Sequence, residues 1–475
     1  MAAIAMAVGT GNIWRFPRMA AANGGGAFVI ILIIAVFVCS VPLLMSEMAI
    51  GRHTRKGTIG AAGDFMGAGF AWIGAWMGFV CIAIMFYYSV VAGWTIKYVV
   101  LSLQGEFVVG TDTKFLWDTF STSPRQTIFY HFIAMASAFF ILFQGVVKGI
   151  ERYSRILLPV LALLLVAGAL RALTLPGASL GVEYLFRIDT DYLLNPRTWL
   201  EGFTQAAWST GAGWALLMTY AIYTRPQDGI GRSMFVVAYA DIAVAIIAGL
   251  AILPTVFALA SSIEYAHNAL AAGNAGMTFI YMSELFTLMP GGYFMAIVFF
   301  SGLAFSALSS LISMVEVGVA NLVTAGWSRK KAVLFTCGAG FICGIPSAWS
   351  LEFLNNQDFV WGVALLISGM FTAIAIIKFG VERVRTEHIN QPGTRIRTGR
   401  WYNVLICINP VIISIIFAWL VYQSVIHDPA NWWNPFREST AGTMFFQWMT
   451  VLIILMLVNR KLVRYFNPGP LKGSQ

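Results

Sequence analysis

Two glycines interrupt the first apolar segment of the chain, in the stretch Ala7-Val8-Gly9-Thr10-Gly11-Asn12-Ile13-Trp14-Arg15-Phe16-Pro17. A second interruption, Ser209-Thr210-Gly211-Ala212-Gly213, lies inside a later apolar segment that begins near Trp199. Glycine weakens a helix by about 1 kcal/mol relative to alanine, and in lipid the freed backbone groups must find another partner. Interrupted apolar helices in corresponding halves of a membrane protein mark sites where an ion or a substrate carboxylate is that partner.

The composition is that of a polytopic membrane protein. Of the 475 residues, 59% are hydrophobic and only 11% are charged, against about 25% charged in soluble domains. The formal net charge is +9, but the basic residues gather in short loops between apolar segments. The positive-inside rule explains that placement without nucleic-acid binding. The five cysteines lie in apolar segments and form no CxxC pair, so we expect buried, unpaired thiols.

About twelve segments are apolar over the roughly 20 residues that a spanning helix needs. Basic residues follow every even-numbered segment, such as Arg52, Arg55 and Lys56 after the second, whereas acidic residues follow the odd-numbered ones. This asymmetry predicts a multi-pass protein of the cell's inner (plasma) membrane with both termini in the cytoplasm. The expected segments are 1–21, 26–51, 72–104, 127–147, 153–174, 198–223, 229–260, 290–323, 331–349, 359–380, 402–424 and 441–463.

The two interrupted segments are the first and the sixth, which indicates a repeat of five helices. The first repeat covers residues 1–174, the second covers 198–380, and the last two helices, within 402–463, lie outside it. An odd number of helices in each repeat inverts the second copy in the membrane. The predicted fold is therefore an all-α polytopic bundle with a 5+5 inverted repeat and broken first and sixth helices. We expect short helices within 261–290, as a packed cap or a lid over an outer vestibule.

Motifs in both halves of the chain narrow this prediction to a family. They are Gly9–Pro17 followed by Asn23–Phe28, Pro42–Leu44 with Glu47 and Gly51-Arg52, Tyr87-Tyr88 with Trp94-Thr95, Lys148–Arg152, and Trp327–Ala332. Together they resemble the neurotransmitter:sodium symporters, which have the LeuT-type fold, and the resemblance covers nearly the whole chain. It implies a carrier that couples the entry of small zwitterions to sodium.

The resemblance implies two sodium sites made of oxygen ligands, the ligands that hard cations prefer. The alternatives are that the polar residues only pair with one another in lipid or that the serines bond back to their own helices. The first site would use the carbonyl of Ala7 and the side chains of Asn12, Ser209 and Asp241. The second site would use the carbonyls of Ala5, Val8 and Ser306 and the hydroxyls of Ser309 and Ser310.

The resemblance also implies a substrate site at the first break. Backbone amides at Gly9 and Gly11 would bind the substrate carboxylate, because a half-helix N-terminus offers free N–H groups and a partial positive charge. Tyr88 would donate its hydroxyl to the same carboxylate, and Glu47 would anchor the unwound backbone nearby. The rest of the substrate pocket would be lined by Met6, Ile84, Trp208, Gly211, Trp214, Leu311 and Met314.

Gates are implied at both ends of the site. Arg15 and Asp358 match an outer gate pair, with Trp208 over Tyr88 as an aromatic lid beneath them. Exposed ion pairs are worth at most about 1 kcal/mol, so such a gate can open thermally. At the inner end, Thr324 stands where the family has an acidic residue. Either the inner gate uses other contacts, or residues that precede this sequence supply it.

These features predict a sodium-coupled symporter that imports a small zwitterion by alternating access, most simply a neutral amino acid or an amino-acid-like compound. Met6 occupies a position that is often polar in the family, and Trp208 and Trp214 replace frequent phenylalanines. Because indole faces attract cations, a methylated ammonium zwitterion or a taurine- or GABA-like substrate is the alternative. A receptor that binds without transport is a further alternative.

The predicted partners are the substrate, sodium as the co-transported ion and the lipid bilayer; chloride stays open. The apolar outer faces suit either a homodimer or lipid contact. No enzymatic activity is expected. An intramembrane hydrolase would need a base near Ser309 or Ser310, and the only histidine inside an apolar segment is His131, which is not in either broken helix.

Overall fold

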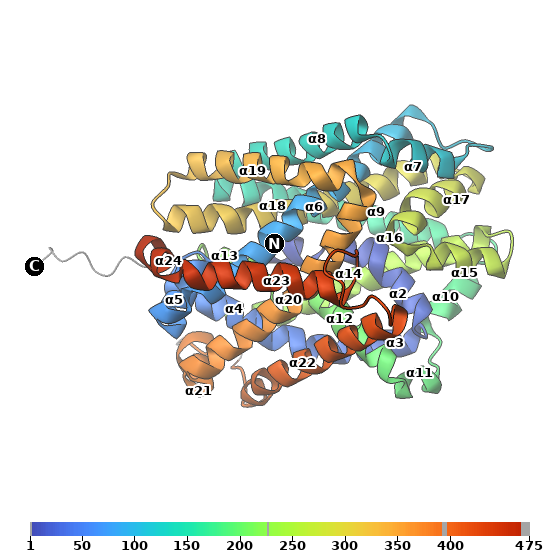
Figure 1. Cartoon of the computed structure of the whole chain (residues 1–475). Coiled ribbons are helices and arrows are strands. Elements are labelled where there is room, and N and C mark those ends of the chain that lie inside the picture. Colours follow the sequence, from blue (N-terminus) through green and yellow to red (C-terminus); the bar gives the residue numbers. More distant parts are fainter. Residues whose placement is uncertain (1, 226–227, 392–396, 467–475) are drawn as a thin grey trace, which may run out of the picture.

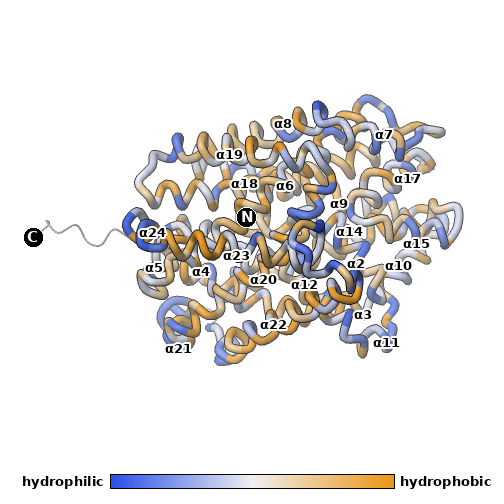
Figure 2. The backbone as a smooth tube through the Cα atoms, viewed as in Figure 1, coloured by the Kyte–Doolittle hydropathy of each residue, from blue (hydrophilic) through white to orange (hydrophobic). Residues whose placement is uncertain are grey.

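The computed structural model describes residues 2–225, 228–391 and 397–466. Long helices run side by side, and short helices cap both ends of the bundle (Figure 1). Apolar residues follow the long helices, and the polar residues gather mostly toward the ends and loops (Figure 2). This distribution fits helices whose middle portions face lipid or one another.

Within the described residues, nine helical segments are long and apolar enough to cross a membrane. A bent pair, α23 (Ala441–Leu457) and α24 (Asn459–Phe466), is a tenth. Two broken helices, described next, complete the predicted twelve (nine plus one plus two). The nine are the continuous segment α3 (Gly26–Ala35), η2 (Val36–Ser40) and α4 (Val41–Thr54), followed by α6 (Ala71–Gln104), α8 (Pro124–Phe143), α9 (Arg152–Leu173), α14 (Ile230–Leu259), α18 (Gly292–Thr324), α19 (Arg329–Trp349), α20 (Leu351–Phe379) and α22 (Trp401–His427).

The first and sixth helices break at the predicted glycines. α1 (Ala2–Ala7) ends before Gly9, and the chain continues as η1 (Gly11–Arg15) and α2 (Phe16–Ala22). α12 (Pro196–Thr210) ends at Gly211, whose φ is +74°, and α13 (Leu216–Ala221) follows. A left-handed φ costs an L-residue roughly 1–2 kcal/mol, so glycine at position 211 permits the chain to leave the helix there.

The last predicted span, 441–463, is wrong at its end. The helix stops at Leu457, and α24 turns away from it by 61°. No glycine lies at this bend, so the sequence lacks the signal that marked the other two breaks. The polar Asn459 and the basic residues after it make a straight continuation through lipid unfavourable.

The two ends of the bundle differ in their short elements (Figure 1). One end, called the cap end below, carries α7 (Thr113–Ser121), α10 (Ala178–Phe186), α11 (Thr190–Leu194), α15 (Ile263–Ala271), α16 (Gly273–Ala275), η5 (Gly276–Tyr281) and α17 (Met282–Leu288). The last four are the short helices expected within 261–290. The opposite end, called the basic end, carries α5 (Thr58–Met66), η3 (Ala68–Phe70), α21 (Val381–Arg383), η6 (Val384–Ile389) and α24.

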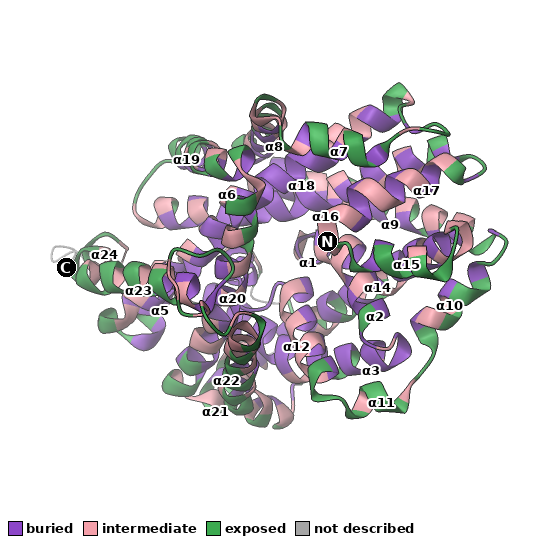
Figure 3. Cartoon of the chain, turned by 45° about the vertical axis from the view of Figure 1, so that its right-hand side comes forward, coloured by how far each residue is buried: buried purple, intermediate pink, exposed green. Residues whose placement is uncertain are grey.

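Helices α6 and α18 pack against each other through the middle of the bundle, where both are mostly buried (Figure 3). Trp76, Tyr98 and Phe300 on these helices are among the largest fully enclosed side chains. Such close packing holds α18 rigidly beside the first broken helix, which it also contacts.

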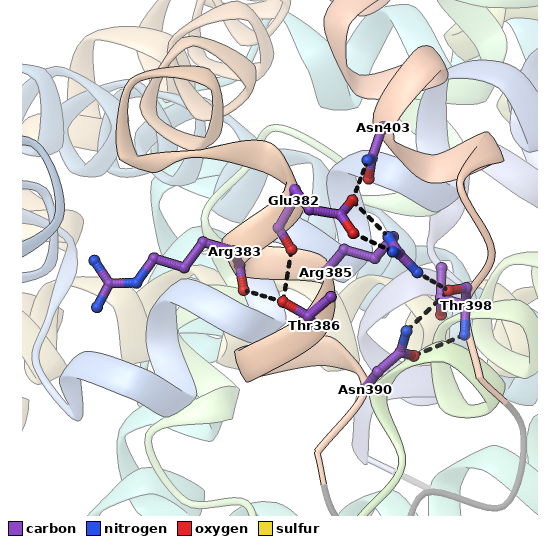
Figure 4. Close-up of polar contacts among 7 residues, drawn as sticks. All are labelled: Glu382, Arg383, Arg385, Thr386, Asn390, Thr398 and Asn403. Atoms are coloured by element: carbon purple, nitrogen blue, oxygen red, sulfur yellow. Dashed lines mark hydrogen bonds and ion pairs between the residues drawn. The ribbon is translucent and has the colours of Figure 1, made fainter.

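At the basic end, polar contacts tie the segment after α20 to the start of α22 (Figure 4). Arg385 forms an ion pair with Glu382, which also accepts a hydrogen bond of 2.5 Å from Asn403 Nδ2. Asn390 accepts from the backbone of Thr398 at 2.7 Å and donates to its carbonyl at 2.9 Å. These contacts fix η6 against the bundle.

Candidate ion and substrate site

Three polar side chains meet next to the first break. Asn12 on η1 donates from Nδ2 to Asp241 Oδ1 on α14 at 2.7 Å and to Ser209 Oγ on α12 at 3.1 Å. Ser209 Oγ donates to Asp241 Oδ2 at 2.6 Å. All three are buried, and a buried carboxylate is costly unless it is paired. The structure therefore brings together the three side chains predicted for the first sodium site, and Ala7 is buried at the end of α1 beside them.

The amide of Asn12 is oriented by the break itself. Its Oδ1 accepts a hydrogen bond from the backbone N–H of Gly9 at 3.1 Å, while its Nδ2 faces the Asp241 carboxylate. A half-turn about the last side-chain bond exchanges these two atoms. After that turn Oδ1 would join the Ser209 and Asp241 oxygens as a cation ligand.

A second group of oxygens lies where α18 crosses α1. Ser309 Oγ donates to the carbonyl of Ala5 at 2.5 Å, and Ser306 Oγ donates to that of Val8 at 3.4 Å. These two hydroxyls bond across to α1 and to the break that follows it, instead of back to their own helix. Ser310 is also adjacent, because a Cβ added to Gly9 would lie 2.8 Å from its Oγ. The structure thus gathers every residue predicted for the second sodium site.

A cavity of about 720 Å³ opens beside these oxygens and extends toward the cap end, where Trp117 and Asn274 line it. Its volume lies within the range of small-molecule sites. Tyr88 lines it, with the hydroxyl 3.1 Å from Thr10 Oγ1. Of the ten predicted substrate-site residues, eight line the cavity: Met6, Gly9, Gly11, Tyr88, Trp208, Gly211, Trp214 and Met314.

The other two predicted residues, Ile84 and Leu311, are not in the lining. Both are fully buried in the core. Their faces of α6 and α18 were assigned by resemblance alone, and the packing between those helices encloses them. They therefore shape the site only through the residues that they support.

The aromatic residues of the site form a corner instead of a lid. The rings of Trp208 and Trp214 meet edge to face, with centroids 5.6 Å apart. Trp208 also packs onto α20, where a Cβ on Gly362 would lie 2.3 Å from its ring. The described rings include no contact between Trp208 and Tyr88, so the predicted lid is not formed. The space at Gly211 is filled by Met6, whose Cε would lie 3.5 Å from an added Cβ.

The predicted outer gate pair is also not formed. Arg15 instead hydrogen-bonds Gln205 and lies 3.8 Å from Glu201, both on α12. Among the ion pairs of the described chain, none joins Arg15 to Asp358, although both residues line the cavity. Glu201 and Gln205 were not predicted from the sequence; the available signal was their spacing of one helical turn, which puts both on one face of α12.

The unwound part of the sixth helix is held from behind by Glu47 on α4. Its Oε1 accepts hydrogen bonds from the backbone N–H groups of Gly213 at 2.8 Å and Ala215 at 3.2 Å. Glu47 is fully buried. It satisfies donors that the helix break leaves without partners, which is the anchoring arrangement expected for it.

On the opposite side of the site, a polar network closes the bundle toward the basic end. Glu316 on α18 forms a two-point ion pair with Arg329, with both N–O distances 2.8 Å, and accepts from Tyr223 Oη at 2.7 Å. Tyr220 Oη and Ser313 Oγ are 2.7 Å apart. These residues were not predicted from the sequence, although an acid inside an apolar helix was the available signal.

Thr324 takes a different role from the absent acid. Its hydroxyl accepts a hydrogen bond of 2.8 Å from the backbone of Gly57, at the start of α5. Arg55 meanwhile donates to the carbonyls of Ile222 and Thr224, after α13, at 2.6 and 2.7 Å. The basic end is thus closed by contacts within residues 2–225 and 228–391.

Comparisons with known proteins agree with this geometry. A family model described as the sodium:neurotransmitter symporter family matches residues 1–123 and 122–465. The chain is 29% identical to an uncharacterized sodium-dependent transporter, YhdH, of Bacillus subtilis, over 89% of this chain and 95% of the relative. It is 26% identical to a sodium- and chloride-dependent GABA transporter, ine, of Drosophila melanogaster, over 73% of this chain and 42% of that protein. The crystal structure of MhsT in complex with L-phenylalanine superposes with a TM-score of 0.76 at 29% identity, covering 88% of this chain and 96% of that one.

Proposed function

We propose that the chain, which belongs to the sodium:neurotransmitter symporter family and is a sodium-dependent transporter, not an enzyme, imports a small zwitterion. The simplest such substrate is a neutral amino acid. The observation that carries this proposal is the first break. It places the backbone amides of Gly9 and Gly11 and the Tyr88 hydroxyl beside a cavity that the Asn12–Ser209–Asp241 oxygens adjoin, and the Gly9 N–H is held by Asn12 Oδ1 until that amide turns.

A substrate carboxylate at this break would receive two kinds of stabilisation. The N–H groups at the start of η1 carry a partial positive charge, and a sodium ion held by Asp241 would add a full one at short range. The substrate and the ion would then strengthen each other's binding, which is the coupling that a symporter requires.

The arrangement of the two ends supports alternating access. The cavity reaches the cap end, and the network around Glu316 closes the basic end. Transport would require the reverse arrangement, in which Arg15 and Asp358 approach each other and the Glu316–Arg329 pair separates. Ligands drive such a cycle only through different affinities for its states. The basic end would face the cytoplasm of a plasma membrane, with both termini inside.

A methylated ammonium zwitterion is the second candidate substrate, with a taurine- or GABA-like compound beside it. The edge-to-face pair of Trp208 and Trp214 and the packing of Met6 against Gly211 make this part of the lining aromatic and apolar. The attraction between a cation and the face of an indole ring is worth about 0.5–2 kcal/mol. L-phenylalanine bound to MhsT supports the amino-acid candidate instead.

Substrate uptake into proteoliposomes tests the proposal. An inward sodium gradient, with potassium in place of sodium as the control, is applied with neutral amino acids, taurine, GABA and methylated zwitterions. Sodium-dependent accumulation of one class would support symport and identify the substrate. Sodium-dependent binding without accumulation would favour a receptor that does not transport.

A further inference from the structure

We propose that α24 and the rim of the bundle beneath it form a binding surface for anionic phospholipid headgroups. The surface consists of Arg460, Lys461 and Arg464 on α24, with Lys378 at the end of α20. It lies at the basic end, away from the ion and substrate site (Figure 1).

The position of α24 is fixed by its first residue. Asn459 Nδ2 donates to the carbonyls of Ala68 and Gly69 on η3, both at 3.3 Å, and Asn459 Oδ1 accepts from the backbone of Trp72 at 2.9 Å. At the other end of α24, a Cβ on Gly60 of α5 would lie 3.0 Å from the carbonyl oxygen of Phe466. The helix therefore rests on α5 and η3 along its length.

The bend directs α24 across the direction of the spanning helix that precedes it. α23 ends at Leu457, which is 79% exposed, and α24 leaves it at 61°. An exposed apolar side chain at the end of a spanning helix faces lipid tails. A helix that turns there lies close to the depth of the lipid headgroups.

The two faces of α24 suit that position. Leu462, Val463 and Phe466 are half-buried against the bundle, while Arg460, Lys461 and Arg464 are exposed. α24 contains no acidic residue, and no ion pair within the described part of the chain involves these three cations. Lys378 adds a fourth exposed cation, with Nζ 3.4 Å from the ring centroid of Phe70 on η3.

The partner that fits is an anionic phospholipid and not a soluble anion. Its phosphate complements the exposed cations, and its acyl chains can pack beside the exposed Leu457 and Met456 next to them. Basic clusters directly after a spanning helix attract anionic headgroups in this way. A soluble anion would use only the charges.

The test uses the full chain in neutral detergent, titrated with short-chain phosphatidylglycerol or phosphatidylcholine, with bound lipid counted by native mass spectrometry. The variant R460Q/K461Q/R464Q should bind phosphatidylglycerol roughly 100-fold more weakly, and each single change about fivefold more weakly. The charge-preserving variant R460K/K461R/R464K should retain the affinity and controls for misfolding. Arg125→Gln, an exposed cation at the opposite end, should have no effect.

Four results would overturn the proposal. The first is equal affinity of the unchanged protein for the two lipids. The second is unchanged phosphatidylglycerol binding in the triple variant, and the third is an equal loss in Arg125→Gln. The fourth is binding of water-soluble glycerol phosphate as tight as that of the lipid, which would assign the surface to a soluble anion.

Discussion

At the scale of single residues, Asp241 is the strongest candidate for a direct sodium contact. It is buried, and its two carboxylate oxygens face Asn12 and Ser209. Asp241→Asn keeps the shape and removes the charge. Hydrogen bonds and contacts to a charged group contribute about 1.5–3 kcal/mol, so we expect sodium affinity to fall by roughly 10- to 100-fold.

Sodium-dependent stabilisation is the measurement, because a bound ion raises stability in proportion to the logarithm of its concentration over Kd. The sodium-induced rise in Tm should largely disappear in Asp241→Asn while the variant remains folded in potassium. Glu183→Gln, an exposed acid on α10, serves as the matched control. An unaltered sodium response in Asp241→Asn would remove Asp241 from the site.

Gly9 and Gly11 offer a matched pair with different surroundings. An added Cβ at Gly9 would lie 2.8 Å from Ser310 Oγ, whereas a Cβ at Gly11 meets nothing within 4 Å. Overpacking costs typically about 1–3 kcal/mol, and the cost at Gly9 should lie at the low end because the Ser310 hydroxyl can rotate away while its Cβ is 3.9 Å from the added Cβ. Gly9→Ala should therefore lower Tm modestly, and Gly11→Ala should change it little. Thermal unfolding of both variants in the absence of sodium checks this, and equal losses would contradict the close approach of α18 to the break.

At the scale of elements, the sequence identified the two broken helices but not the bent one. The glycine pairs at 9/11 and 211/213 report a backbone that cannot remain helical. The polar and basic residues from Asn459 onward mark where the span ends, but the direction of α24 is set by the packing of Asn459 on η3, a contact 390 residues away in sequence that local composition cannot indicate. Eight of the ten predicted substrate-site residues line the cavity, but the resemblance could not show which faces of α6 and α18 pack against each other.

The element η6 gives the fold a dependence on pH. His388 contacts His53 at the end of α4, with ring centroids 4.4 Å apart. Burial first, and then the positive charges of His53, Arg383 and Arg52, lower the pKa of His388 below its ordinary value of 6.5, and Glu387 opposes them. Above pH 6.5 the imidazole is neutral in both the folded and unfolded chain. As the pH falls below 6.5, the unfolded chain takes up the proton first, so the folded state loses stability.

We therefore expect Tm to fall between pH 7 and pH 5, and His388→Gln to flatten that decline. His427→Gln, an exposed histidine at the end of α22, should leave the decline unchanged. A second loss should begin below pH 4.5, because Arg385, and then Asn403, lower the pKa of Glu382 to about 2. The contribution of Glu382 is complete above pH 4.5 and is lost as the pH falls toward 2. Identical pH profiles for the unchanged protein and His388→Gln would contradict the role of the histidine.

At the scale of the whole molecule, we expect the predicted ion site, the cavity and the closed basic end to be parts of one equilibrium. The first helix contributes to both predicted sodium sites and to the cavity, and α18 contributes to the second predicted site and, through Glu316, to the closure. A substitution at the basic end should therefore alter sodium affinity although the substituted residue is not one of the predicted sodium ligands. The inverted repeat predicted from the positions of the breaks provides the two-state scaffold that such coupling needs.

Arg329 and Glu316 allow this coupling to be tested with two variants of different strength. Arg329→Gln leaves the buried Glu316 carboxylate without its ion-pair partner, a change that costs about 3–5 kcal/mol for buried pairs, somewhat less here because Arg329 is partly exposed. Glu316→Gln removes the buried charge itself and should destabilise the closed basic end less. Both variants should favour opening at the basic end, Arg329→Gln more strongly. Both should also weaken sodium binding, because the state that binds sodium from the cap end is less populated.

Thiol labelling of Ser313→Cys would report that opening, because position 313 is buried beside Tyr220. The labelling is done in a background in which the exposed Cys343 and Cys407 are replaced. We expect labelling to be fastest in Arg329→Gln, slower in Glu316→Gln and slowest in the unchanged protein, and we expect sodium to slow it in each case. Labelling at a rate that does not depend on sodium would show that the two ends are not coupled.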